Sequence, residues 1–106
     1  MKMKTLITSK GDSTDSFFDL RFGRGKYFCI HDSETGNIEF IENLNAEAQG
    51  GAGTKTAEKV IELGVKKVIS GDFGPKAKDL LMKFKIQMVM ITDSNKTVME
   101  IIKSLS

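Results

Sequence analysis

Residues 54–92, TKTAEKVIELGVKKVISGDFGPKAKDLLMKFKIQMVMIT, decide the fold class of this chain. Their first part carries apolar residues at helical spacing and ends at Gly64, which is placed to stop a helix. The run VKKVIS (65–70) is strand-like, and Pro75 suits the first position of a second helix. QMVMIT (87–92) is apolar on both faces, which is typical of a strand covered on both sides. This alternation of helix and strand predicts a parallel βαβαβ unit.

Shorter β-rich segments precede this unit. KTLITS (4–9), KYFCIHD (26–32) and NIEFIEN (37–43) have strand character, and the last two are joined by a turn that suits a hairpin. A polar loop with three phenylalanines (11–25) leads from the first strand to the hairpin. The chain closes with a helix that begins at the capping box of Thr97. We therefore expect an α/β single domain in the order β-β-β-α-β-α-β-α, with a mixed five-stranded sheet and three helices on both of its faces.

The composition excludes several function classes. The chain has 106 residues, 40% hydrophobic and 28% charged, so residues 1–106 are expected to form one ordinary globular domain. A net charge of +2, with basic and acidic residues interleaved, argues against nucleic-acid binding. No apolar run approaches the roughly 20 residues that span a bilayer. The one cysteine, Cys29, excludes an internal disulfide and Cys-rich metal motifs, and we expect a cytoplasmic protein.

Three loops are predicted to meet at one edge of the sheet. If the first, third, fourth and fifth strands share one direction, the loops after the first, third and fourth strands lie where those strands end. Helices start from the same edge, and each N-terminus presents unpaired N–H groups and about half a positive charge. We therefore predict an anion-binding crevice, although glycines are also common there for turn geometry alone. Its candidate residues are Arg21, Phe22, Gly23, Arg24, Gly51, Gly53, Gly71 and Gly74.

No motif indicates catalysis. GGAGTKT (50–56) misses the phosphate-loop pattern, because Thr54 separates the last glycine from the lysine. Cys29 and His31 share a face of their strand, but two ligands alone do not make a metal site. The single His is also expected at the edge opposite the glycine loops, so no Cys–His or Ser–His–Asp arrangement can be argued. We expect a protein that is not an enzyme, and no metal-coordinating residue is assigned.

Taken as a set, four stretches resemble the dinitrogenase iron–molybdenum cofactor-binding family, which includes NifX-like small cofactor carriers and free-standing homologues. They are RFGRGKYFCIHD (21–32), GGAG (50–53), ELGVKKVISGDFGPKA (62–77) and FKIQMVMI (84–91), and they stand in the family's order. The resemblance implies a ribonuclease-H-like arrangement of the sheet. It also implies a non-enzymatic role, in which an anionic metal–sulfide cluster is held during assembly or transfer.

One position departs from the family. Many members have His directly before the Phe-Gly step, and that His is a candidate cluster ligand, whereas this chain has Arg21. A protonated guanidinium cannot coordinate a metal. We therefore do not expect Arg21 to coordinate a nitrogenase-type cofactor directly. Its positive charge can still bind an anionic cluster electrostatically. Some members of the family bind a molybdenum–copper sulfide cluster in roughly that way.

The sequence thus supports a carrier for an anionic metal–sulfur cluster, either iron–molybdenum cofactor-like or a molybdenum–copper sulfide. Arg21 and Arg24 would supply charge, Phe22 a packing wall, and the glycines close backbone approach. The expected partners are proteins that donate or accept the cluster. The alternative is a binding module for another anion or a protein partner, with the metal function lost. The loops at 10–25 and 44–53 are expected to be mobile without ligand.

Overall fold

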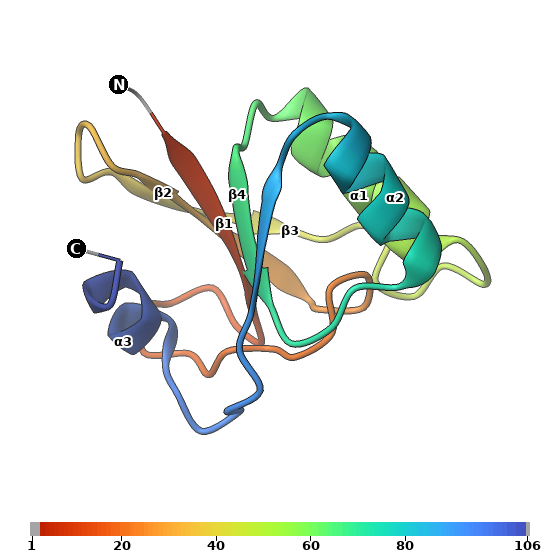
Figure 1. Ribbon diagram of the computed structural model, residues 1–106. Coiled ribbons are helices and arrows are strands. Elements are labelled where there is room, and N and C mark those ends of the chain that lie inside the picture. Colours follow the sequence, from red (N-terminus) through yellow and green to blue (C-terminus); the bar gives the residue numbers. More distant parts are fainter. Residues whose placement is uncertain (1–2, 106) are drawn as a thin grey trace.

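The computed structural model describes residues 3–105, and Figure 1 shows their arrangement. The elements follow one another as β1 (Lys4–Ser9), β2 (Tyr27–Asp32), β3 (Ile38–Glu42), α1 (Ala52–Glu62), β4 (Lys67–Ser70), α2 (Pro75–Lys83), β5 (Gln87–Met90) and α3 (Val98–Lys103). The predicted single α/β domain with a mixed five-stranded sheet and three helices is confirmed. No helix among the described residues is long and apolar enough to cross a membrane.

The strands lie in the order β3-β2-β1-β4-β5. β2 is antiparallel to both β1 and β3, whereas β4 is parallel to β1 and to β5. Four strands, β1, β3, β4 and β5, therefore run in one direction and end at the same side of the sheet. We call that side the carboxyl edge and the opposite side the amino edge. The loops after these strands gather at the carboxyl edge.

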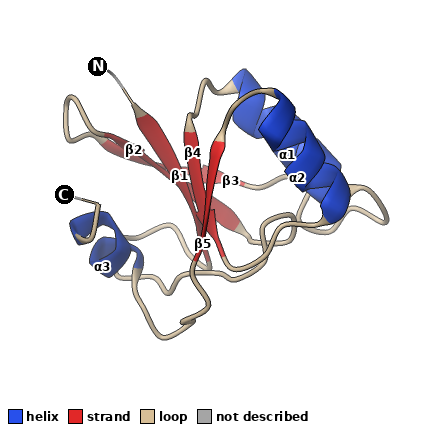
Figure 2. Cartoon of the chain, in the orientation of Figure 1, coloured by secondary structure: helices blue, strands red, loops and turns tan. Residues whose placement is uncertain are grey.

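The helices cover both faces of the sheet, as Figure 2 shows. α1 and α2 bury Val60 and Leu81 against one face, to which β1 contributes Leu6. α3 buries Ile101 against the other face, to which β1 contributes Ile7. The alternation along β1 follows from the two-residue period of a strand, and it divides the apolar core into two layers.

Local signals set most of the helix ends. α1 is followed by Gly64 at φ +74°, a left-handed conformation that glycine adopts without steric cost. α2 has Pro75 in its first turn, and the capping box at Thr97 opens α3 as predicted. α1 begins at Ala52, two residues before the predicted start, because the left-handed Gly51 already directs the chain into the helix.

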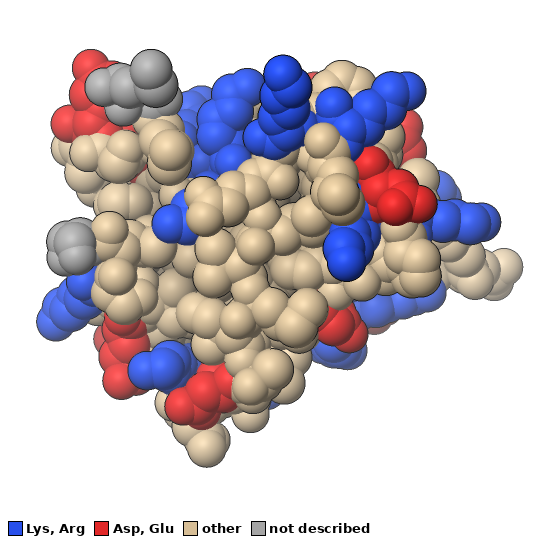
Figure 3. Space-filling model, in the orientation of Figure 1, with Lys and Arg blue, Asp and Glu red and all other residues tan. Residues whose placement is uncertain are grey.

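The prediction that residues 87–92 form a strand covered on both sides is confirmed only in part, because Met88 and Val89 pack against the two core layers but the strand is shorter and exposed at its end. β5 ends at Met90 and is an edge strand, with Met90 62% exposed. Phe84, just before this strand, is 48% exposed as well. In the orientation of Figure 1, Figure 3 shows a broad uncharged zone over the middle of this face, with Lys and Arg mainly along its upper margin. Hydropathy alone does not distinguish an apolar edge strand from a central one.

The segment between β1 and β2 is fixed by hydrogen bonds to the chain around α3. The Phe18 N–H donates to the Lys96 carbonyl at 2.9 Å, and the Val98 N–H donates to the Ser16 carbonyl at 2.9 Å. Phe18 is fully buried, whereas its neighbour Phe17 is 51% exposed. Mobility without ligand was predicted for the loops at 10–25 and 44–53. Because of these hydrogen bonds, we expect the loop after β3 to be more mobile than residues 16–19.

Candidate anion-binding site

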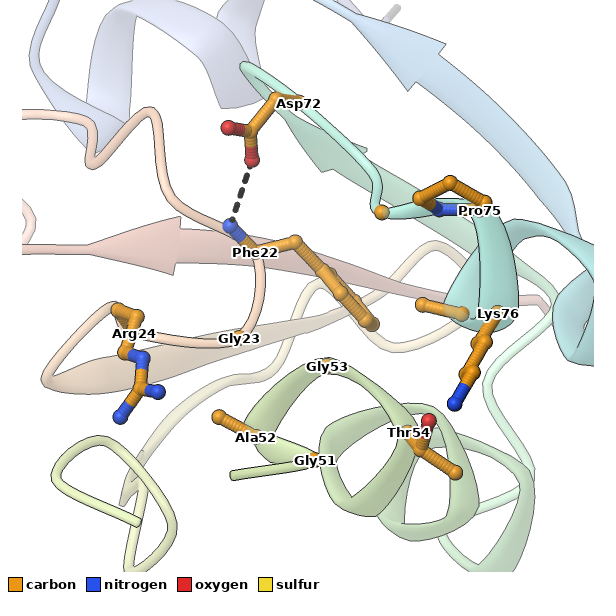
Figure 4. A pocket seen from close by; sticks show the side chains of 12 residues that line it. Phe22, Gly23, Arg24, Gly51, Ala52, Gly53, Thr54, Asp72, Pro75 and Lys76 are labelled. Atoms are coloured by element: carbon orange, nitrogen blue, oxygen red, sulfur yellow. Dashed lines mark hydrogen bonds between the residues drawn. The ribbon is translucent and has the colours of Figure 1, made fainter. Parts of the chain in front are cut away.

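A cavity of about 440 Å³ opens at the carboxyl edge, between the starts of α1 and α2. Its walls come from the loop after β1 (22–24), the start of α1 (51–54), the loop after β4 (72 and 74) and the start of α2 (75–77). Figure 4 shows these segments converging on one space. The structure therefore brings together the three loops that the strand directions predicted.

Both helices point uncapped N-termini at this cavity. The N-cap residues are Gly51 for α1 and Gly74 for α2, and neither supplies a side-chain hydrogen bond. The first N–H groups of a helix have no acceptor within the helix. Each N-terminus also carries about half a positive charge from the helix dipole. Donors and positive potential are thus directed at the same space, the arrangement that binds anions at helix starts.

Gly23 is required where the loop after β1 rests on α1. A Cβ atom at this position would lie 2.7 Å from the Gly53 nitrogen and 3.0 Å from the Ala52 carbonyl carbon. Backbone atoms cannot rotate away as a flexible side chain can. At Gly53 itself, a Cβ would meet the Ala77 Cβ at 3.6 Å, which is an ordinary contact. The close approach at Gly23 brings its neighbours, Phe22 and Arg24, to the cavity.

Two cationic side chains flank the start of α1 (Figure 4), Arg24 on one side and Lys76 on the other. Arg24 Nη1 donates to the Ala46 carbonyl at 3.2 Å and also to the Ala48 carbonyl. A guanidinium has five N–H donors, so Arg24 retains donors for an anion while it holds the loop after β3. Sequence reasoning missed Lys76, although its place directly after Pro75, in the first turn of α2, is a signal that could have found it.

Asp72 places a carboxylate in the wall of the cavity, and sequence reasoning missed this residue too. Its Oδ1 accepts a hydrogen bond from the Phe22 N–H at 3.4 Å, drawn as the dashed line in Figure 4. The bond ties the loop after β1 to the loop after β4. The negative charge also opposes any anion in the cavity, so Asp72 limits affinity while it holds the wall together.

Six of the eight predicted site residues line the cavity, and Arg21 and Gly71 do not. Arg21 pairs with the buried Asp19, its Nη2 lying 3.1 Å from Oδ2 and its Nε 3.1 Å from Oδ1. Burial alone would raise the pKa of Asp19, but the hydrogen bonds and charge of Arg21 lower it overall. At Gly71, a Cβ would lie 2.6 Å from the Leu20 Cβ, so this glycine serves packing.

No chelating cluster accompanies the cavity. Within residues 3–105, no group of three or more His, Cys, Asp or Glu side chains could hold a metal ion. Cys29 is fully buried, and burial raises the pKa of its thiol to about 12, which keeps it protonated. His31 lies at the amino edge, away from this cavity. An anion here would be held by backbone N–H groups and cationic side chains.

The sequence of the chain was compared with those of known protein families. The sequence pattern of the dinitrogenase iron-molybdenum cofactor family matches residues 1–106. The chain belongs to this family. The predicted membership is thereby confirmed, and the solved structures that the fold resembles agree with it.

The superpositions with two of those structures include 97% of this chain and 86% of the other chain. The apo form of the orange protein from Desulfovibrio gigas superimposes with a TM-score of 0.89 at 26% identity. A putative NifB protein from Thermotoga superimposes with a TM-score of 0.82 at 31% identity. An uncharacterized protein from Methanocaldococcus jannaschii is 34% identical over 70 residues, a match that spans 59% of that relative's length and 63% of this chain.

Proposed function

We propose that this protein is a non-enzymatic carrier that binds an anionic metal–sulfur cluster in the cavity at the carboxyl edge. The observation that carries the proposal is the meeting of two uncapped helix N-termini, at Gly51 and Gly74, with Arg24 and Lys76 around one cavity. Membership of the cofactor family supports the same role. Each part of this site favours an anion, and none of it requires a catalytic group.

The residues present fit such a cargo. A thiometallate cluster is a bulky anion whose sulfides accept hydrogen bonds, and the cavity of about 440 Å³ offers donors from two helices. Hydrogen bonds to a charged partner contribute about 1.5–3 kcal/mol each. Since no group of three or more His, Cys, Asp or Glu side chains among residues 3–105 could hold a metal ion, the cluster would keep its own sulfur ligands and be held from outside.

This manner of binding favours a molybdenum–copper sulfide over an iron–molybdenum cofactor that needs a protein ligand. Arg21 stands where a coordinating His would be expected, and it is already paired with Asp19. We further propose a cytoplasmic location and partner proteins that donate or accept the cluster. The ribonuclease-H-like arrangement also stays a proposal, supported by the order β3-β2-β1-β4-β5 with β2 antiparallel to its neighbours.

An anaerobic titration tests the proposal. Purified protein is titrated with tetrathiomolybdate, with and without copper(I), and the visible charge-transfer bands are recorded. We expect saturable binding that Arg24→Ala and Lys76→Ala each weaken about tenfold. Lys78→Ala is the matched control, because Lys78 lies on the same helix but lines a different surface hollow. Equal affinity in all four proteins, or no saturable band with folded protein, would overturn the proposal.

The alternative is a module that binds another anion, with the metal function lost, and the paired state of Arg21 favours it. The wild-type titration distinguishes the two cases, because only the proposed carrier binds tetrathiomolybdate saturably. If wild type does not bind it and Arg21→His gains metal-cluster affinity, the metal function was lost with the ligand. If neither protein binds it and sulfate or phosphate binds to the wild-type cavity, the cavity serves another anion.

A further inference from the structure

A row of polar side chains crosses the sheet near its amino edge. Thr5 of β1 stands opposite His31 of β2 and opposite Lys67 of β4, so these three residues are neighbours on adjacent strands. Two positions further along the same strands, Ile7 and Ile69 pack in the core layer beneath α3. Because side chains alternate across a strand, the row lies on the α3 face of the sheet. The row adjoins the apolar core layer beneath α3.

A second cavity, of about 400 Å³, lies over this row, and we call it the amino-edge cavity. The row forms part of its lining, and the end of α3 and the residues after it supply Ile102 and Leu105. Met3 adds a further apolar wall. None of the described residues that line this cavity carries a carboxylate, and it shares no lining residue with the cavity at the carboxyl edge.

His31 lines this cavity, and its Nδ1 is buried without a hydrogen-bond partner. Buried polar atoms are nearly always hydrogen-bonded, so each exception calls for an explanation. Among residues 3–105, the other enclosed side-chain atom without a partner is the hydroxyl oxygen of Thr56 on α1, which lines neither cavity. The residue with the orphaned atom thus lines a cavity that two lysines, Lys67 and Lys103, also line.

We propose that the amino-edge cavity binds a small amphipathic carboxylate. With its proton on Nδ1, His31 donates to one carboxylate oxygen, and the Lys67 ammonium pairs with the head group from across the row. The aliphatic part of the ligand packs against Met3, Ile102 and Leu105, which would otherwise face water. The head group satisfies the orphaned nitrogen, and the tail covers the apolar wall. This site is independent of the proposed cluster cargo.

Hexanoate is the probe for the test, with hexanol as its uncharged counterpart and inorganic phosphate as an anion without a tail. The full chain, labelled with ¹⁵N, is titrated while the imidazole nitrogens of His31 and the backbone amides are followed by NMR. We expect saturable shifts of the His31 ring and of Thr5, and weaker saturation or none with hexanol and phosphate. His31→Phe and Lys67→Met should each weaken hexanoate binding about tenfold.

Lys66→Met is the matched control, since it removes the same charge one residue earlier, from an exposed side chain that does not line the cavity. It should leave hexanoate affinity unchanged. The proposal is overturned if the His31 ring of the wild type shows no saturable shift. It is equally overturned if hexanol or phosphate binds as tightly as hexanoate, or if Lys66→Met weakens binding as much as Lys67→Met. The wild-type titration alone decides the matter if a variant fails to fold.

Discussion

Gly23→Ala tests the architecture of the carboxyl edge most sharply. The added Cβ would lie 2.7 Å from the Gly53 nitrogen and 2.9 Å from the Gly53 Cα. Ordinary contacts of such atoms begin at about 3.4 Å, so the loop after β1 and the start of α1 must separate by about half an ångström or more. Both partners are backbone, and neither can swing aside. The methyl group would also cover the donors at the start of α1.

Overpacking of this kind costs about 1–3 kcal/mol. For a domain of this size, each kcal/mol lowers Tm by about 4–8 °C, so we expect a decrease of at least about 4 °C. The assay is chemical denaturation of wild type and variant, with thermal unfolding beside it. Gly74→Ala is the control, because its φ of −62° is ordinary and no atom lies within 4 Å of the added Cβ. It should stay within about 0.5 kcal/mol of wild type. Equal stability of the Gly23 and Gly74 variants would refute the close approach of loop and helix.

Three further predictions concern the surroundings of the site. Arg24→Ala removes the hydrogen bonds to the loop after β3, so amide exchange in residues 44–50 should become at least several-fold faster. Exchange in residues 16–19 should not change. Unchanged exchange in residues 44–50 would contradict this prediction. Asp72→Asn removes a charge that opposes an anion in the cavity but keeps an acceptor for the Phe22 N–H. Tetrathiomolybdate should therefore bind about three- to tenfold more tightly. Weaker binding would contradict the inference that the charge of Asp72 limits affinity. The pKa of Asp19 is lowered from its ordinary value of 3.8, so its contribution to stability is present above that value and lost as pH falls through the folded-state pKa. Asp19→Asn should therefore flatten the acid limb of the unfolding free energy, and an unchanged limb would contradict the assignment.

The fold was predictable because the signals that start and end its helices are local in the sequence. Gly64 and Pro75 mark a helix end and a helix start by conformational preference alone, and Thr97 opens α3 through a box of neighbouring residues. With the elements in place, strand direction brings the loops to one edge whatever their sequence. The neighbours of a strand within the sheet are not a local property, which is why the exposure of Met90 on the edge strand β5 escaped prediction.

The site was predictable in outline but not in its charges. Glycine turns and helix starts gave its position, whereas Lys76 and Asp72 enter it only through the packing of α2 and the loop after β4. Arg21 looked equivalent to Arg24 from the sequence. The structure separates them, because the buried carboxylate of Asp19, two residues earlier, binds Arg21 instead. The distribution of ion pairs depends on side-chain directions that a loop sequence does not specify.

In the proposed function, an anionic metal–sulfur cluster binds between the starts of α1 and α2. The most direct measurement is an amide ¹H–¹⁵N spectrum of the protein, recorded anaerobically before and after saturation with tetrathiomolybdate and copper(I). If the cluster binds there, the largest shifts should fall on the N–H groups of Gly53, Thr54, Lys76 and Ala77, which line the cavity at the two helix starts. Largest shifts elsewhere, such as on β5 or at the amino edge, would contradict it.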